Sequence, residues 1–353
     1  MHEIVINLHM HTRYSDGHLT HEQIADSALK AGIDAAIVTD HNIWINKHEK
    51  CYKNGDRRVL LIIGEEIHDQ ARHPQKSHLL VFGVERELAA LAFDPQRLLD
   101  TIRQAGGLAF IAHPVDPASP AFHEPDISWV DWHINGYTGI ELWNAMSEFK
   151  SLLKGRLHGL YYALNPRRVN SNPFPAALKK WDELLTGERR VVAVGGSDAH
   201  GFPLRIGPIR RTLYPYEFHF RAINTHLLVP DPLSGDIIGD KQIIFDALRK
   251  GHAFIGYDLP APTRGFRFTG QGLAGMVQMG DEISAKNGVT LQVRLPQRVE
   301  CRLICNGNII KTWRNREICT YITTDPGAYR IETYIHYLGR KRGWIFSNPI
   351  YLL

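Results

Sequence analysis

Short apolar strands alternate with amphipathic helices along the first 258 residues, and this alternation limits the fold more than any other feature. It predicts an α/β domain with a mostly parallel sheet. The strands are expected at 3–8, 35–38, 59–63, 78–83, 108–111, 138–142, 190–194 and 253–256. The strand at 78–83 is expected to be antiparallel, because few residues separate it from the one before. A helix is expected over 21–31, with a capping box between Thr20 and Gln23 at its start and Gly32 at its end. Further helices are expected from Pro95 to the glycines at 106 and 107, and over 241–250.

The pattern changes at about residue 259. Segments such as GVTLQVRL, ECRLICNG and YRIETYIH are short, rich in β-branched and aromatic residues, and broken by Gly, Pro and Asn. Such segments are typical of an all-β sandwich. The sequence therefore predicts two domains, 1–258 and 259–353, with LPAPTRG as the linker between them.

Composition excludes several classes of protein. A hydrophobic content of 44% with 22% charged residues is that of an ordinary globular chain, and a net charge of +4 is too mild to indicate nucleic-acid binding alone. No apolar run approaches the ~18 residues of a membrane helix, and the start lacks a secretory pattern. We therefore expect a cytoplasmic protein with no membrane partner. The four cysteines are too few for a disulfide framework, so Cys301 and Cys305 are expected to be reduced.

Histidine is unusually abundant and unevenly placed. Of 19 histidines, 18 precede residue 259, and only His336 follows it. Ligand-type residues also recur where apolar strands end: His9 and His11, His41, Glu65 and Glu66, His113, and Asp198 and His200. In parallel α/β barrels these strand ends open onto one face.

Each motif alone has an ordinary explanation. The Asp16-Gly pair suits a turn, and a single His-x-His is a weak signal. Taken together, so many imidazoles and carboxylates at one face would be costly to bury without cations. The sequence therefore predicts a metal site.

The motifs HMHTRYSDG, TDHN, GEE, SHLLVFG, AHP, GIELWN and GSDAH, in this order, resemble those of the polymerase and histidinol phosphatase (PHP) family of metal-dependent phosphoesterases. The resemblance covers residues 1–258. It implies a distorted TIM-like (β/α)7 barrel that holds two or three divalent metal ions, commonly zinc, manganese or iron.

The resemblance also implies which residues bind each metal ion. His9 and His11, with Glu66 and Asp198, would hold the first metal; Asp16, His41 and His200 the second; and His78 and His113 a third, bridged to the first by Glu66. Glu65 in place of Glu66, and His68 or His73 in place of His78, remain alternatives. Asp40 is expected to orient an imidazole, and Asn42 is given no role.

Metal chemistry then suggests the reaction. A hydroxide held between cations by the residues of the first two positions would hydrolyse a phosphomonoester or phosphodiester without a side-chain nucleophile. Arg13, Arg205 and Arg210 flank the motifs and could bind the substrate phosphate, although ordinary exposed arginines explain each of them as well. The segment 115–136 is either a lid over the site or a hydrophobic plug.

Two other functions remain open at this stage. The C-terminal sandwich resembles, more loosely, the accessory domain of a PHP branch that includes carbamate- and amide-hydrolysing enzymes, so the same metals could cut such a bond. A non-catalytic metal-binding scaffold is the second. The expected partner is a small phosphorylated substrate, with a nucleotide or nucleic acid as the alternative, and the oligomeric state is undetermined.

Overall fold

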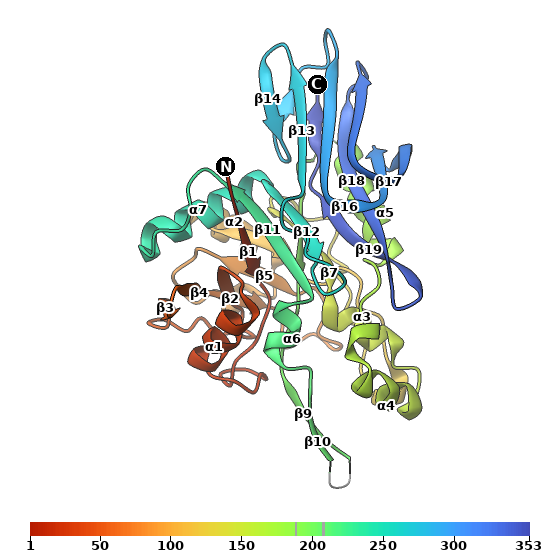
Figure 1. The fold of residues 1–353 in the computed structure, drawn as a ribbon. Coiled ribbons are helices and arrows are strands. Elements are labelled where there is room, and N and C mark those ends of the chain that lie inside the picture. Colours follow the sequence, from red (N-terminus) through yellow and green to blue (C-terminus); the bar gives the residue numbers. More distant parts are fainter. Residues whose placement is uncertain (188, 207–208) are drawn as a thin grey trace.

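The computed structural model describes residues 1–187, 189–206 and 209–353. In its N-terminal part, seven strands lie side by side (Figure 1). They are β1 (His2–Asn7), β2 (Ala35–Val38), β4 (Arg57–Ile67), β5 (Leu79–Phe82), β6 (Leu108–Ile111), β7 (Gly139–Asn144) and β8 (Val192–Gly196). The pairs β1–β2, β2–β4, β6–β7 and β7–β8 are parallel. The pairs β4–β5 and β5–β6 are antiparallel, which confirms the expectation for residues 78–83.

These strands do not close into a barrel. The second edge of β1 is occupied by β11 (Ile223–Val229), which pairs with it antiparallel from His2 to Ile6. Between β8 and β1 the described β pairing is one isolated bridge beyond the strand ends, between Met10 and Ala199. The mixed α/β fold is confirmed, but the expected TIM-like (β/α)7 barrel is not, because β11 takes the edge that β8 would need.

Two of the helices begin and end at clear capping residues. α1 (His21–Ala31) starts with the predicted capping box between Thr20 and Gln23 and stops at Gly32, whose φ is 81°. α7 (Ile237–Lys250) starts four residues earlier than expected, because the side chain of Asp236 accepts from Gly239 N at 3.0 Å. The remaining helices are α2 (Pro95–Gln104), α3 (Ala145–Leu152), α4 (Arg156–Leu164), α5 (Pro175–Thr186) and α6 (Tyr216–Phe220), with 3-10 turns at Ala89–Leu91, Pro120–Phe122 and Pro166–Arg168.

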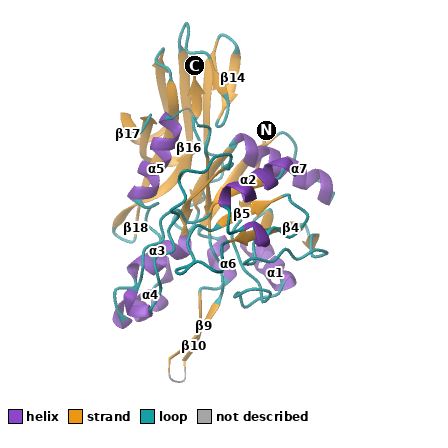
Figure 2. Ribbon diagram, turned by 180° about the vertical axis from the view of Figure 1, so that it is seen from behind, coloured by secondary structure: helices purple, strands orange, loops and turns teal. Residues whose placement is uncertain are grey.

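Two hairpin arms extend this part of the chain. β3 (Lys50–Asn54) folds back on β4, and β9 (Phe202–Ile206) pairs with β10 (Ile209–Leu213). The β9–β10 hairpin projects from the same end of the molecule as α4, as both views show (Figure 1, Figure 2).

The C-terminal part contains only strands among its described elements, as expected. They are β13 (Arg267–Gly272), β14 (Gly275–Gln278), β15 (Glu282–Ile283), β16 (Val289–Cys305), β17 (Asn308–Thr323), β18 (Gly327–Tyr337), β19 (Arg340–Ser347) and β20 (Ile350–Leu352). β12 (Ala253–Tyr257) pairs with β11 on one side and with β19 on the other, so hydrogen bonding continues across residue 258. The division into domains at that residue stays a prediction. The cysteines are free.

The segment 115–136 lies partly in the hydrophobic core. Trp129 is buried, and Trp132 packs against the same cluster of side chains. This placement supports the interpretation as a hydrophobic plug over that of a lid. Among the described residues, no helix is both long and apolar enough to cross a membrane.

Candidate metal centre

The predicted ligands lie in one cluster, most of them beside the ends of strands and Glu66 within β4. Two backbone bridges hold the segments that carry them: Met10 with Ala199, and His41 with Glu66. The Tyr216 hydroxyl, from α6, donates to the carbonyl oxygens of His11 and His200 at 2.6 and 2.9 Å. The first and last histidine segments are therefore held in a fixed relation to each other.

His9, His11, Glu66 and Asp198 form the first group, and all four are buried. His9 Nε2 lies 2.9 Å from Glu66 Oε2, and His11 Nε2 lies 3.1 Å from Asp198 Oδ1. Their candidate ligand atoms all fall within 4.8 Å of one another. One cation could therefore contact all four side chains.

His11, Asp16, His41 and His200 form the second group. Asp16 Oδ2 is 3.2 Å from His200 Nε2 and 3.6 Å from His41 Nε2. The side chain of Asp16 is 50% exposed, whereas that of Asp198 is 13% exposed. The second group is thus the side of the cluster that opens to solvent.

Glu66, His78 and His113 form the third group, which is again buried. Glu66 Oε1 lies 2.8 Å from His78 Nδ1 and 3.0 Å from His113 Nε2. The other oxygen of Glu66 faces His9 and His11. One carboxylate therefore presents a separate oxygen to each of two groups, which is the arrangement of a bridging ligand.

Electrostatics in the cluster reflect this pairing. Burial opposes charge on Glu66, but the surrounding imidazoles outweigh it and hold the pKa of this carboxyl well below its usual range. Burial likewise lowers the pKa of His113, yet Glu66 outweighs it and raises the pKa to about 9. The cluster is thus built to stabilise buried charge.

The donor set fits divalent cations. Imidazole nitrogens and carboxylate oxygens are the ligands that zinc, manganese and iron accept. His11 Nε2 faces the first group, and its Nδ1 lies 3.8 Å from Asp16 Oδ1 of the second group. This Nδ1 atom is buried and has no hydrogen-bond partner among the described residues. Buried polar atoms without partners are rare in folded proteins, so this nitrogen is consistent with a cation bound in the second group.

The structure separates the residues that the sequence left ambiguous. Strand alternation turns Glu65 away from the cluster toward Glu87, and burial with that neighbour raises the pKa of Glu65 to about 10. His73 is exposed, whereas His68 stacks on His78 with ring centroids 4.3 Å apart. The candidate ligand atoms of His41, His68 and His78 also lie within 4.8 Å of one another. His68 therefore borders the cluster.

Asp40 has a different role from the expected one. It accepts hydrogen bonds from Thr12 N at 2.7 Å, Thr12 Oγ1 at 2.6 Å and Ser15 Oγ at 2.6 Å, and among the described residues it is hydrogen-bonded to no imidazole. It therefore orders the loop that carries Asp16. Asn42, which was given no role, bonds the side chain and backbone of His68.

Sequence reasoning missed a role for Glu141 of β7. Its Oε1 lies 3.0 Å from His9 Nδ1, and its Oε2 accepts from Asn144 Nδ2 at 2.9 Å. Glu141 is buried in the middle of a strand, inside the motif GIELWN. A carboxylate in an otherwise apolar, fully buried strand was the available signal.

The three arginines lie at the surface. Arg13 is exposed, and its Nε donates to the carbonyl oxygen of His18 at 3.3 Å. Arg205 and Arg210 are register partners on the projecting β9–β10 hairpin, and both are exposed. Their role in substrate binding stays a prediction.

Residues 7–99 match the family described as the PHP domain. The resemblance to the PHP family is confirmed. The matched segment contains the first four motifs of the series, from HMHTRYSDG to SHLLVFG. Seven of the nine candidate ligands lie in these motifs or in AHP, which follows the matched segment. The PHP match itself ends before His113, Asp198 and His200, which only the fold joins to it.

Solved structures provide further comparisons. A two-domain protein from Bacteroides vulgatus, containing a predicted PHP-like metal-dependent phosphoesterase, is 15% identical with a TM-score of 0.45, over 99% of this chain and 95% of that one. A protein from Bifidobacterium adolescentis, provisionally assigned as a metal-dependent phosphoesterase, is 14% identical with a TM-score of 0.34, over 57% of this chain and 91% of that one. No curated protein matches the chain.

Proposed function

We propose that this protein is a metal-dependent phosphoesterase that hydrolyses a small phosphomonoester or phosphodiester at a di- or trinuclear centre. The observation that carries the proposal is the position of Glu66, whose two oxygens face two different groups of histidines. The PHP match over residues 7–99 supports the same function.

The nine candidate ligands would hold the ions in three positions. They are His9, His11, Asp16, His41, Glu66, His78, His113, Asp198 and His200. When bound, divalent cations lower the pKa of a water molecule and withdraw charge from phosphoryl oxygens.

The exposure of the site residues indicates the side from which substrate would enter. Asp16, half-exposed, and His200 form the solvent side, so substrate is expected to enter there. Glu66 and Asp198 are deeper and counter the cationic charge in the interior. Asp40 and Tyr216 fix the loops that carry these ligands, so little reorganisation is needed when substrate binds.

The test is a substrate panel with one metal-loaded preparation. Zinc, manganese and iron forms are assayed on a chromogenic phosphomonoester, a phosphodiester and an aryl carbamate. We expect turnover of a phosphoester, and its loss in His9→Ala with the fold kept by circular dichroism. Exclusive turnover of the carbamate would replace the proposal with a carbamate or amide hydrolase. Tight metal binding with no turnover of any ester would favour a scaffold.

A further inference from the structure

Helix α4 presents an apolar stripe to solvent. Leu157, Leu160, Tyr161 and Leu164 recur at the i, i+3, i+4, i+7 spacing of one helix face, and they are 82, 40, 44 and 54% exposed. Such a stripe ordinarily faces the protein core. Here it faces outward, and no residue of the helix is buried. Contiguous exposed apolar side chains of this kind mark interaction surfaces.

The opposite face of α4 is anchored to the protein. A Cβ atom on Gly159 would lie 2.8 Å from the ring of Phe122, and the carbonyl oxygen of Tyr162 accepts from the Tyr214 hydroxyl at 2.9 Å. Tyr162 also packs against the cluster of Phe149 and Tyr214. The helix is therefore held in one orientation, with its leucines directed away from the body.

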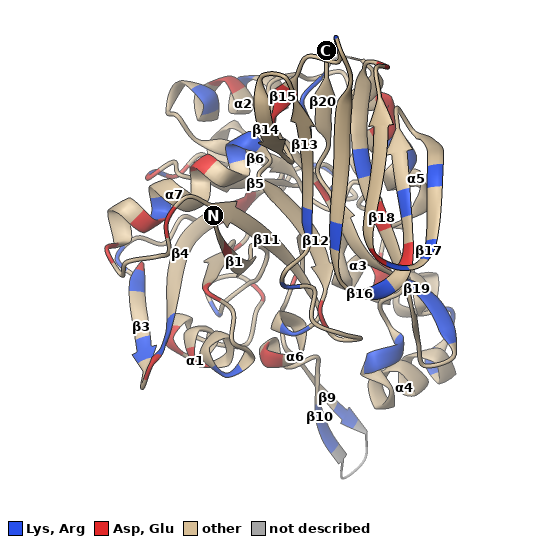
Figure 3. Ribbon diagram, turned by 45° about the horizontal axis from the view of Figure 1, so that its top comes forward, with Lys and Arg blue, Asp and Glu red and all other residues tan. Residues whose placement is uncertain are grey.

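Basic residues surround the stripe. Lys154, Arg156, Arg167 and Arg168 flank the helix and are exposed. The sequence contains no Asp or Glu from residue 149 to residue 181. The neighbouring β9–β10 hairpin adds Arg205, Arg210 and Arg211, and basic positions mark both elements in Figure 3.

We propose that α4 and its basic flanks form a docking surface for an anionic lipid bilayer, with the leucines placed among the acyl chains and the cations at the headgroup phosphates. Interfacial helices combine these two features, and each basic residue near an anionic leaflet adds to the attraction. This proposal departs from the expectation of no membrane partner, which rested on the lack of a spanning segment.

Charge and chemistry favour a bilayer over the other occupants. Two copies of this surface would bring like charges together, which disfavours self-association through α4. A nucleic acid would engage the arginines but would leave three leucines without an apolar partner, since its stacking sites are aromatic. A bilayer provides headgroup phosphates for the cations and acyl chains for the leucines.

The experiment is co-sedimentation of the full chain with vesicles. We expect binding to vesicles of phosphatidylcholine mixed with phosphatidylglycerol, little binding to phosphatidylcholine alone, and weakening by salt. The variant Leu157→Gln/Leu160→Gln/Leu164→Gln keeps good helix formers at exposed positions. It should lower the bound fraction by about tenfold or more, as should Arg156→Gln/Arg167→Gln/Arg168→Gln.

A matched control is Ile238→Gln on α7, where the exposed side chain lies outside this surface; its vesicle binding should equal that of the unmodified chain. The proposal would be overturned by no binding to anionic vesicles, by unchanged binding of the leucine variant, or by a dimer in light scattering that the leucine variant dissociates. Tight binding of a labelled oligonucleotide that is insensitive to the leucine changes would assign the arginines to a nucleic acid and also overturn it.

Discussion

The Nδ1 atom of His9 lies 3.0 Å from Oε1 of Glu141, while the Nε2 atom of the same ring faces Glu66 at 2.9 Å. The imidazole is therefore held from behind by one carboxylate and directed by its other nitrogen into the candidate metal cluster. Carboxylates in this position fix the tautomer and the orientation of a ligating histidine.

Glu141→Gln should therefore weaken metal binding without removing a ligand. We expect the affinity for zinc or manganese to fall by about 10- to 100-fold, because the ring of His9 loses its anionic partner. Competition with a chromophoric chelator measures the change. Glu183→Gln, on the exposed face of α5, is the control and should bind metal normally. Equal affinity in the two variants would remove Glu141 from the site.

Substitution by glutamine should lower the metal content at Glu66 but leave it unchanged at the adjacent Glu65. Glu66 contacts five imidazoles, those of His9, His11, His41, His78 and His113, so Glu66→Gln should reduce the metal content of the purified chain by at least about one ion. Glu65, whose raised pKa keeps it protonated at neutral pH, is close in shape and charge to glutamine. Glu65→Gln should retain full metal content by elemental analysis. The reverse result would assign the bridge to Glu65.

A second pair of variants tests the register of the histidines after β4. His78→Ala should lower the metal content, because His78 Nδ1 faces Glu66 Oε1, the proposed bridging ligand, at 2.8 Å. His73→Ala should leave metal content unchanged, because this side chain is exposed. His68→Ala tests whether His68 takes the place of His78. Loss of an ion with His68→Ala alone would show that the third position uses His68 instead.

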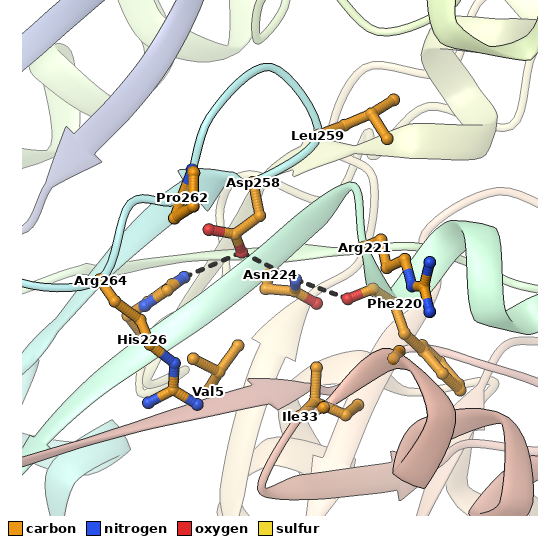
Figure 4. Close-up of a pocket in the computed structure, with 12 residues that line it drawn as sticks. Val5, Ile33, Phe220, Arg221, Asn224, His226, Asp258, Leu259, Pro262 and Arg264 are labelled. Atoms are coloured by element: carbon orange, nitrogen blue, oxygen red, sulfur yellow. Dashed lines mark hydrogen bonds and ion pairs between the residues drawn. The ribbon is translucent and has the colours of Figure 1, made fainter.

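An ion-pair triad around the buried His226 lies away from the cluster and supplies a pH-dependent stability. His226 Nδ1 lies 2.9 Å from Glu3 Oε1. Its Nε2 lies 3.1 Å from Asp258 Oδ2 (Figure 4). Burial lowers the pKa of His226, but Asp258 and Glu3 outweigh it and raise the pKa to about 9. Arg267 also pairs with Glu3, and Thr263 contacts both His226 and Asp258.

Because the pKa of His226 is raised, the stability that it contributes is lost at high pH. The contribution of His226 to stability is fully present below its ordinary value of 6.5 and is lost as the pH rises through about 9. Denaturant unfolding at a series of pH values should show this alkaline decline. His226→Leu should abolish that part of the decline and lower the free energy of unfolding at neutral pH by about 3 kcal/mol, because two partly buried carboxylates lose a partner.

Two further measurements keep this prediction testable. If His226→Leu does not fold, Asp258→Asn should still fold with a smaller alkaline decline, because one of the two carboxylates that raise the pKa of His226 is gone. The control His336→Leu, at an exposed position of β18, should follow the unmodified chain. An unchanged pH profile in the His226 and Asp258 variants would show that the imidazole is not charged in the folded state.

The sequence by itself determined the local features. The capping box of α1 and the strands at residues 35–38 and 108–111 were predicted as they stand. His9, His41 and Asp198 follow the ends of β1, β2 and β8 as expected, whereas Glu65 and Glu66 lie within β4, which continues to Ile67. These features depend on periodicity and on capping side chains, which act over a few residues. The family motifs also contained the candidate metal ligands.

Only the tertiary structure decided the rest. β11 occupies the edge of β1 and prevents closure of the sheet, and this competition between strands more than 200 residues apart leaves no mark on either segment. The choice between Glu65 and Glu66, the support of His9 by Glu141, and the outward direction of the α4 leucines depend in the same way on which surfaces meet. A helical apolar stripe predicts that a face will be covered, but only the packed chain shows whether the chain itself covers it.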